Sequence, residues 1–238
     1  MGRILTVSDL HGMLPLWQQI KDFLQPDDQL IVLGDCADRG RDGWQIIKDC
    51  LTDERITYIR GNHEDLLLKA WRTEFTGEEF YLWMCNGGGT TYEALMAEEK
   101  PDMWLHELNY QTKYFAVYEN ERGDIIHLTH AGFTPVDSDF YPSKYDLIWD
   151  REHLEDYPCS WWDKENPKDI VVHGHTPLPS LARRLGAPTF EWGAFWYASN
   201  HKVDIDNGCC DTGVACLFDL DTFDEHIFVG EINEKDYI

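Results

Sequence analysis

The sequence predicts an α/β protein whose first third forms a parallel β-sheet from βαβ units. Short apolar runs of strand length alternate there with segments that carry apolar residues at helical spacing. Parallel neighbours need crossover helices of this kind between them. The expected strands are residues 4–8, 29–33 and 56–59, and the expected helices are residues 15–24 and 43–51.

A helical insert follows at about residues 64–108, interrupted by Asn86-Gly87-Gly88-Gly89. No strand precedes this glycine triplet and no Gly-Lys-Ser/Thr ends it, so a helix stop and turn is expected rather than a nucleotide loop. Later residues are strand-like and begin with a hairpin. The expected helices are residues 64–72, 78–85, 91–99 and 102–108, and the expected strands are 114–118, 124–129, 169–172, 195–198, 202–205, 214–218 and 227–229.

The composition is that of a folded, strongly acidic protein. The 238 residues are 43% hydrophobic and include ten tryptophans, which is ample for a core. No linker or repeat divides the chain, so one domain over residues 1–238 is expected. The net charge of −24 argues against nucleic-acid polymers and anionic membranes as partners, because both are bound by an excess of Lys and Arg. An anionic substrate would need metal ions or a few well-placed arginines.

The chain is expected to reside in the cytoplasm. It has no apolar run of membrane-spanning length, and its first residues lead directly into a strand without the apolar core of a signal peptide. The seven cysteines are odd in number and never spaced as Cys-x-x-Cys, which favours reduced thiols. The adjacent pair Cys209-Cys210 is most simply a coincidence of composition.

Polar clusters follow the expected strands, where the carboxyl ends of parallel strands form a ligand crevice. A single Asp at a strand end is usually a turn or cap residue, and a single His there is more often a surface or hydrogen-bonded core residue than a ligand. Five such ends in one chain instead indicate a shared site. The clusters are Asp9-Leu10-His11-Gly12, the segment from Gly34 to Gly40, Gly61-Asn62-His63-Glu64, His130-Ala131-Gly132 and His173-Gly174-His175.

The residue types in these clusters suit two divalent cations. Hard ions such as Mn²⁺ accept carboxylate and imidazole together, and one carboxylate can bridge two ions. A two-metal site, about 3.5–4 Å across, takes its ligands from separate loops. The candidate ligands are Asp9, His11, Asp35, Asn62, His130 and His175, with His173 as an alternative to His175.

The order and spacing of these motifs resemble those of the PPP family of metallophosphoesterases, from Asp9 to about Gly208. The compact length, and Asn86-Gly87-Gly88 before a helix, are more similar to the bacterial and phage Ser/Thr phosphatases than to the eukaryotic ones. Ile205-Asp206-Asn207-Gly208 stands where bacterial members commonly carry Ile-Asp-Thr-Gly. The motifs that carry the resemblance are Asp9-Leu10-His11-Gly12, Gly34-Asp35-x-x-Asp38-Arg39-Gly40, Gly61-Asn62-His63-Glu64, His130-Ala131-Gly132 and Gly174-His175-Thr176.

The resemblance implies a calcineurin-like sandwich of two mixed β-sheets flanked by helices, with the active site at the carboxyl ends of the strands. The implied ligands are Asp9, His11 and Asp35 for one ion, and Asp35, Asn62, His130 and His175 for the other. The implied phosphate-binding residues are Arg39, Asn62 and Arg151. His63 would be the general acid, oriented by Asp38, and Glu64 would begin the next helix.

The implied activity is metal-dependent hydrolysis of phosphomonoesters, first of all phosphoserine and phosphothreonine in proteins. A hydroxide bridging two ions, Mn²⁺ in the first place with Fe or Zn as alternatives, would attack phosphorus in line. Arginines would neutralise the phosphoryl oxygens, and His63 would protonate the leaving alkoxide.

Two other functions stay open. One is a dinucleoside polyphosphate hydrolase of the same family, and the other is a non-catalytic metal-binding protein. The expected partner is a phosphoprotein or a phosphorylated small molecule, and the sequence does not specify an oligomeric state. Substrate choice is expected to lie in the insert and in residues 133–145, where Tyr141 and Tyr145 could stack on a base or simply pack.

Overall fold

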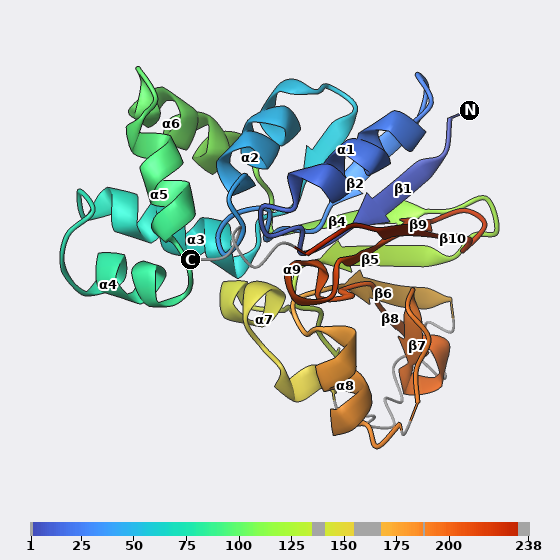
Figure 1. Cartoon of the computed structure of the whole chain (residues 1–238). Coiled ribbons are helices and arrows are strands. Elements are labelled where there is room, and N and C mark those ends of the chain that lie inside the picture. Colours follow the sequence, from blue (N-terminus) through green and yellow to red (C-terminus); the bar gives the residue numbers. More distant parts are fainter. Residues whose placement is uncertain (1, 135–140, 155–167, 188, 233–238) are drawn as a thin grey trace.

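The computed structural model describes residues 2–134, 141–154, 168–187 and 189–232, and it forms a sandwich of two five-stranded sheets (Figure 1). Both sheets mix parallel and antiparallel pairs, as predicted. The first has the strand order β10-β9-β1-β2-β3 and the second β4-β5-β6-β8-β7. The strands are β1 (Ile4–Val7), β2 (Gln29–Val32), β3 (Ile56–Tyr58), β4 (Phe115–Glu119), β5 (Ile125–Thr129), β6 (Asp169–His173), β7 (Phe195–Tyr197), β8 (Lys202–Asp204), β9 (Val214–Asp219) and β10 (Glu225–Val229).

The core has a layer on each side of the first sheet, because successive side chains of a strand point to opposite faces. Leu30 and Val32 of β2 pack with α1 (Leu14–Phe23) and α2 (Gly43–Thr52). Ile31 instead packs with residues of the second sheet such as Leu128. Burial on both faces explains why β2 is apolar from Leu30 to Val32.

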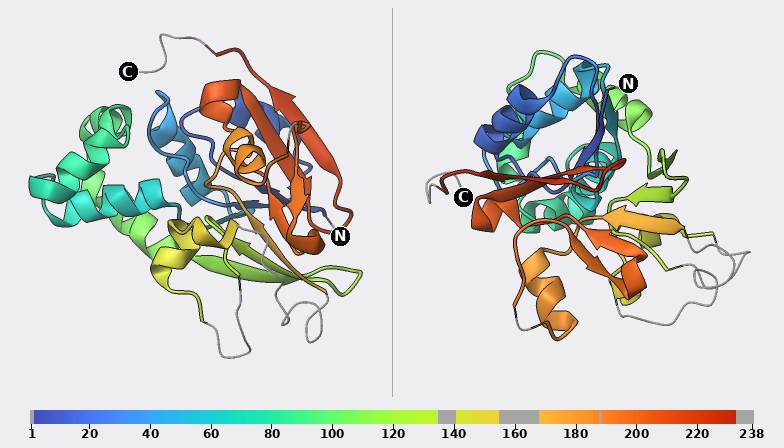
Figure 2. Two further views of the ribbon diagram at one scale, coloured as in Figure 1. Left: turned by 90° about the horizontal axis from the view of Figure 1, so that it is seen from below. Right: turned by 90° about the vertical axis from the view of Figure 1, so that its right-hand side faces the viewer.

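Helices also cover the outer face of the second sheet (Figure 2, right). There α7 (Lys144–Ile148) packs on β6 through Leu147 and Val171, and α8 (Leu178–Arg184) packs on β7 through Leu181 and Tyr197. A short helix, α9 (Cys209–Thr212), precedes β9. Among the described residues, no helix is both long and apolar enough to cross a membrane.

The helical insert projects from one end of the sandwich (Figure 1, left). It consists of α3 (Asn62–Arg72), α4 (Gly77–Cys85), α5 (Gly89–Met96) and α6 (Pro101–Gln111). The expected start of α3 at residue 64 is wrong, because α3 begins at Asn62. The Gly61 backbone N–H donates to the Glu64 side chain over 2.9 Å, which closes the first turn two residues earlier.

Three helices were not expected from the sequence: α7, α8 and α9. They have five, seven and four residues, too few to display a helical period. The cysteines outside residues 155–167 are free thiols, as expected, whereas Cys159 lies outside the described residues. Part of the expected substrate loop, residues 135–140, also lies outside them.

Candidate metal centre and active site

The loops after β1, β2, β3, β5 and β6 meet at one edge of the sandwich, where sequence analysis expected the site. Hydrogen bonds join them in pairs. The Asp9 N–H donates to the Gly34 carbonyl over 3.1 Å, and the His175 N–H donates to Asp9 Oδ2 over 3.0 Å. Ring nitrogen Nδ1 of His130 lies 2.7 Å from the Leu33 carbonyl. All six predicted ligands are buried.

Asp35 lies at the centre of this cluster. Its Oδ2 is 3.6 Å from His11 Nε2, 3.4 Å from His130 Nε2 and 3.8 Å from His63 Nε2. Ligand atoms fall into two groups suited to a cation, one from His11, Asp35 and His63 and one from Asp35, His130 and His175. Asp35 belongs to both, which is the geometry required of a carboxylate shared between two ions.

The histidines are oriented by backbone carbonyls. In His11 and His130, Nδ1 lies 2.8 and 2.7 Å from the carbonyls of Ala37 and Leu33, which leaves Nε2 facing Asp35. In His175 the roles are reversed: Nε2 lies 3.3 Å from the Trp149 carbonyl and Nδ1 faces His130. A hydrogen bond from the distal ring nitrogen fixes a metal-binding histidine in the required tautomer.

The second group fits a divalent cation. His130 Nε2 lies 2.9 Å from Asn62 Oδ1, 3.2 Å from His175 Nδ1 and 3.4 Å from Asp35 Oδ2. In the tautomers set by the backbone carbonyls, all four of these atoms are acceptors, so only a proton or a cation between them relieves their repulsion. Metal–ligand distances of about 2.0–2.2 Å place neighbouring ligands about 3 Å apart, which is the spacing seen.

The electrostatic surroundings of these groups favour a positive charge beside Asp35. Burial alone would raise the pKa of Asp35, but the facing imidazoles of His130 and His63 hold it well below its ordinary value. Burial acts to lower the pKa of His130, yet Asp35 and Asp9 raise it to about 10. Burial lowers the pKa of His11 and His175 well below the ordinary range, and the neutral imidazole is the form that binds a metal.

Asp9 lies beside these groups but in neither of them. Its Oδ2 accepts hydrogen bonds from the Ser8 hydroxyl and from the His175 N–H. Gly174 leaves the room that this contact requires, since a Cβ there would collide with Asp9 Oδ2. The structure therefore places Asp9 next to the two groups, and its role as a metal ligand stays a prediction.

His63 and Asp38 form a buried pair next to the metal-binding groups. His63 Nδ1 lies 2.8 Å from Asp38 Oδ2, and His63 Nε2 lies 3.2 Å from Nη2 of half-buried Arg39. Burial opposes a proton on the ring, but the charge of Asp35 and the hydrogen bond to Asp38 raise the pKa of His63 above its ordinary value. A protonated, aligned imidazole is suited to general-acid chemistry.

Glu64 has a larger role than sequence analysis assigned to it. Its carboxylate is fully buried and accepts from four backbone N–H groups, those of Asp35, Cys36, Ala37 and Gly61, at 2.9–3.1 Å. It thereby ties the loop after β2 to the start of α3. The signal for this role was its place three residues after Gly61, the N3 position of a capping box.

Arg151 and His173 differ in their surroundings. Arg151 is exposed beside His175, and its Nε and Nη2 donate over 3.1 Å to the Thr176 hydroxyl and the His175 carbonyl. His173 lies outside both metal-binding groups. Its Nε2 is 2.7 Å from the Tyr197 hydroxyl, in line with the expected strand-end hydrogen bond.

The backbone is strained at this edge of the sandwich. Left-handed φ angles are uncommon for residues other than glycine and concentrate at functional sites. Half of the twelve such residues in the described part of the chain are predicted site residues. They are Asp9 (φ 54°), His11 (φ 40°), Asp35 (φ 54°), Asp38 (φ 69°), Arg39 (φ 65°) and His175 (φ 70°).

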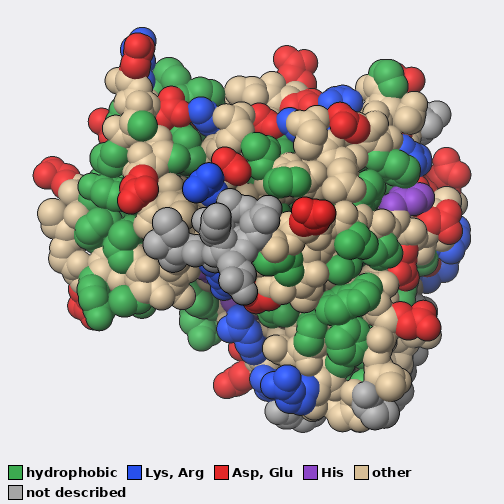
Figure 3. All heavy atoms as spheres, in the orientation of Figure 1, with side chains coloured by type: hydrophobic (Ala, Val, Ile, Leu, Met, Phe, Trp, Pro, Cys, Tyr) green, Lys and Arg blue, Asp and Glu red, His purple; other side chains and the backbone are tan. Residues whose placement is uncertain are grey.

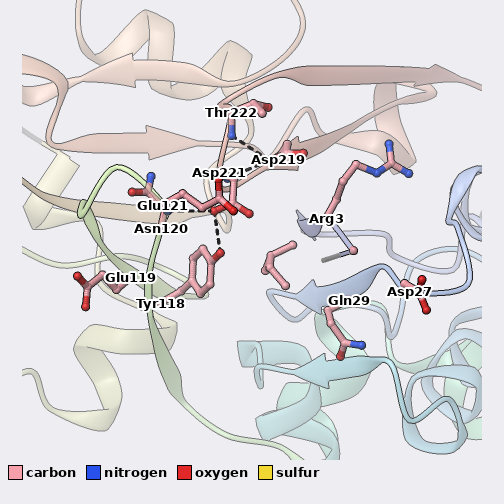
Figure 4. A pocket seen from close by; sticks show the side chains of 12 residues that line it. Arg3, Asp27, Gln29, Tyr118, Glu119, Asn120, Glu121, Asp219, Asp221 and Thr222 are labelled. Carbon is pink, nitrogen blue, oxygen red and sulfur yellow. Dashed lines mark hydrogen bonds between the residues drawn. The ribbon is translucent and has the colours of Figure 1, made fainter.

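A hollow of about 420 Å³ opens beside the site and includes Tyr145, Trp149, Arg151 and Arg184 in its lining. A larger one of about 600 Å³ lies at the opposite ends of the strands, with Arg3 and Asp219 among its residues (Figure 4). It contains none of the predicted site residues. Figure 3 shows acidic and basic side chains spread over the face it draws, with several Lys and Arg side chains in a line that runs downward from the grey residues.

The comparisons with known proteins agree with this geometry. The sequence pattern of the family described as calcineurin-like phosphoesterase matches residues 2–205, and the chain belongs to that family. Members of the family bind two divalent metal ions, which matches the two groups around Asp35. No curated protein sequence matches the chain.

Several solved structures share the fold. A protein provisionally assigned as a diadenosine tetraphosphatase has 18% identity and a TM-score of 0.62, over 98% of this chain and 95% of that one. A protein serine/threonine phosphatase from Saccharomyces cerevisiae, with similarity to human phosphatase PP5, has 15% identity and a TM-score of 0.61, over 98% and 81%. A cold-active protein tyrosine phosphatase has 11% identity and a TM-score of 0.58, over 96% and 76%.

Proposed function

We propose that this phosphoesterase is a phosphomonoesterase of the PPP type that acts on phosphoserine and phosphothreonine in proteins. The observation that carries the proposal is the shared position of Asp35 in two metal-binding groups, with the His63–Asp38 pair next to them. The likeness to the yeast serine/threonine phosphatase supports the choice of substrate. We further propose Mn²⁺ as the metal and the cytoplasm as the location.

The residues that would hold two ions are those predicted from the sequence: Asp9, His11, Asp35, Asn62, His130 and His175. Two divalent cations, when bound, supply the Lewis acidity and the activated water that phosphoester hydrolysis requires. Arg39 and Arg151 stand on either side of the metal-binding groups and would bind the phosphoryl oxygens, where charge spreads in the transition state.

His63 would donate the proton that the leaving alkoxide needs. Its Nδ1 is occupied by Asp38, so Nε2 is the atom directed to the substrate. The Arg39 guanidinium, 3.2 Å from Nε2 in this structure, would turn to the phosphate and free that position. Asp38 keeps the ring aligned and favours its charged form.

A dinucleoside polyphosphate hydrolase is the second candidate. The hollow beside the site supports it, because Tyr145 and Trp149 could stack on a base and Arg151 and Arg184 could bind phosphate oxygens. Three acidic residues, Asp146, Asp150 and Glu152, line the hollow as well. The structure assigned as a diadenosine tetraphosphatase supports it as well. This candidate uses the same metal-binding groups and acid as the first.

Two experiments test the proposal. Protein stripped of metal by a chelator should be inactive, and Mn²⁺ should restore hydrolysis of p-nitrophenyl phosphate. Metal-loaded protein should then receive a phosphoserine peptide and diadenosine tetraphosphate side by side. Hydrolysis of the peptide supports a protein phosphatase, whereas cleavage of the dinucleotide alone rules it out. Loss of all activity with metal bound would favour a binding protein.

The role of His63 has its own test. His63→Asn should lower kcat by about 10²–10⁴-fold, the usual contribution of a general acid, with metal content still near two ions per chain. Metal analysis of the purified variant checks this result. Loss of one ion would instead make His63 a ligand, as its place in the group with His11 and Asp35 allows.

A further inference from the structure

The helical insert reaches the Asp38–His63 pair through a tryptophan. In α4, Nε1 of Trp83 donates to Asp38 Oδ2 over 2.8 Å, and His63 Nδ1 lies 2.8 Å from the same oxygen. Trp83 and Asp38 are both fully buried. A hydrogen bond to a carboxylate is strong where water is excluded. One oxygen of Asp38 therefore joins the proposed acid to the insert.

The insert also holds the backbone around Asp38. The Asp38 N–H donates to the Thr91 hydroxyl over 2.8 Å, and the Arg39 N–H donates to the Gly87 carbonyl over 3.0 Å. Gly87 lies in the turn between α4 and α5, and Thr91 lies in the first turn of α5. The left-handed φ angles of Asp38 and Arg39, 69° and 65°, need such support to persist.

One residue of the glycine triplet, Gly88, leaves the space for the indole. A Cβ on Gly88 would lie 2.6 Å from Cε2 and Nε1 of Trp83, so only glycine permits the present position of the ring. Gly88 has an ordinary φ of −67°, which any residue can adopt. A Cβ on the next residue, Gly89, would meet nothing within 4 Å. Gly88 thus has a packing requirement that its neighbour lacks.

Aromatic rings enclose the other sides of the indole. The ring centroids of Phe75, Phe80 and Tyr92 lie 6.0, 6.3 and 6.2 Å from that of Trp83. They come from the turn before α4, from α4 and from α5. With three rings around it and Gly88 against its edge, the indole has one orientation, and in that orientation Nε1 points at Asp38.

We propose that Trp83 is a positioning residue for proton donation, holding Asp38 in the place from which its carboxylate orients the His63 ring. This inference rests on the proposed function, since it requires His63 to be the general acid. It gives the insert a part in the chemical step, in addition to the part in substrate choice expected from the sequence. A departing group that is itself a weak base needs no proton, so the effect of Trp83 should grow with the basicity of the leaving group.

The test compares aryl phosphates whose leaving groups range from 2,4-dinitrophenol to phenol. Trp83→Phe keeps an aromatic ring and removes the N–H. It should lower kcat for phenyl phosphate about tenfold, consistent with one lost charge-assisted hydrogen bond, and change kcat for the dinitrophenyl ester less than about twofold. Trp71→Phe is the matched control. Trp71 Nε1 donates over 2.9 Å to Asp102 at the surface of the same insert, and its loss should not depend on the leaving group.

A second pair of variants tests the hydrogen bond between Trp83 and Asp38 without removing the indole N–H. Gly88→Ala should displace the indole and reproduce the leaving-group dependence of Trp83→Phe, whereas Gly89→Ala should match wild type. Combining Gly88→Ala with Trp83→Phe should add little, because both changes break one hydrogen bond. Thermal unfolding shows whether each variant is folded.

The outcomes separate this inference from the proposed function. Absence of phosphatase activity in the metal-loaded wild type would overturn both. A His63→Asn variant with unchanged leaving-group dependence would overturn the role of His63 and, with it, that of Trp83. A third outcome separates the two proposals. If His63→Asn lowers kcat most for basic leaving groups, but Trp83→Phe and Trp71→Phe change kcat equally for all the aryl phosphates, the proposed function stands and the role of Trp83 is overturned.

Discussion

Strand β2 is flanked by two buried carboxylates with opposite surroundings. Asp28 precedes the strand, Asp35 follows it, and each is only 2% exposed. Asp28 accepts hydrogen bonds from groups that keep their protons at all ordinary pH values. They are the backbone N–H and guanidinium of Arg3 and the N–H of Gln25, at 2.5–2.9 Å. Asp35 instead faces imidazole nitrogens of His11, His63 and His130 at 3.4–3.8 Å.

The pKa is lowered at both positions, so its direction does not distinguish a structural carboxylate from a predicted metal ligand. Burial works against ionisation in each case. Hydrogen bonds from Arg3 bring the pKa of Asp28 to about 2, and facing imidazoles hold that of Asp35 well below its ordinary value. The type of partner distinguishes them. Fixed donors leave Asp28 satisfied, whereas imidazoles can exchange a proton for a cation and leave Asp35 free to bind one.

Replacement of Asp35 should have the largest effect. Asp35→Asn removes the carboxylate shared by both metal-binding groups. Replacing outer partners of metal ligands costs about 10–100-fold, so loss of the shared ligand should cost more, on the order of 10⁴-fold in kcat/KM. Metal analysis of the dialysed protein should find fewer than two ions per chain. Full activity with two bound ions would remove Asp35 from the centre of the site.

Replacement of Glu64 should have an intermediate effect, since it supports Asp35 without being a predicted ligand. In Glu64→Gln, an NH₂ group replaces one acceptor oxygen and faces backbone N–H groups of the loop after β2 or of Gly61. Buried unsatisfied donors cost about 1–3 kcal/mol each, and we expect that loss in the free energy of unfolding together with a 10–100-fold weaker metal affinity.

Glu98→Gln is the control for this variant. Glu98 is half-buried and accepts from the Trp44 indole over 3.0 Å, away from the strand ends. Urea unfolding and metal titration of both variants should show a metal effect for Glu64 alone. Equal metal affinity in the two variants would mean that Glu64 contributes only to folding.

Replacement of Asp28 should leave catalysis unchanged and reduce stability. The pKa of Asp28 is about 2 in the folded protein and ordinarily 3.8. The ionised carboxylate therefore stabilises the folded state, and this contribution is fully present at pH values above 3.8. Asp28→Asn should therefore lower the free energy of unfolding by about 1–2 kcal/mol at neutral pH. The difference from wild type should shrink as the pH falls from about 4 toward 2.

Urea unfolding at several pH values, with metal-loaded kcat at neutral pH, measures both parts of this prediction. A constant difference at every pH would mean that Asp28 acts through packing rather than charge. A fall in kcat as large as that of Asp35→Asn would contradict a purely structural role for Asp28.

The sequence by itself determined the βαβ framework and the loops that bear the site. Apolar runs such as β2 and the polar motifs after them are local patterns, and parallel strands necessarily bring their carboxyl ends to one edge. The resemblance that those motifs carry implied the two mixed sheets and a metallophosphoesterase, and the structure and the match to the calcineurin-like phosphoesterase family confirm both. The expected start of α3 was two residues late, because a buried side chain, that of Glu64, sets it.

Tertiary structure decided what depends on residues distant in the chain. His130 reaches Asn62 across 68 positions. That His175 rather than His173 faces His130 depends on how the loop after β6 meets the loop after β1. The short helices α7 and α8 have too few turns to be stable alone and form because the second sheet buries their apolar side chains. Trp83 is one aromatic residue among many in the sequence, and only the packing of the insert turns its N–H toward Asp38.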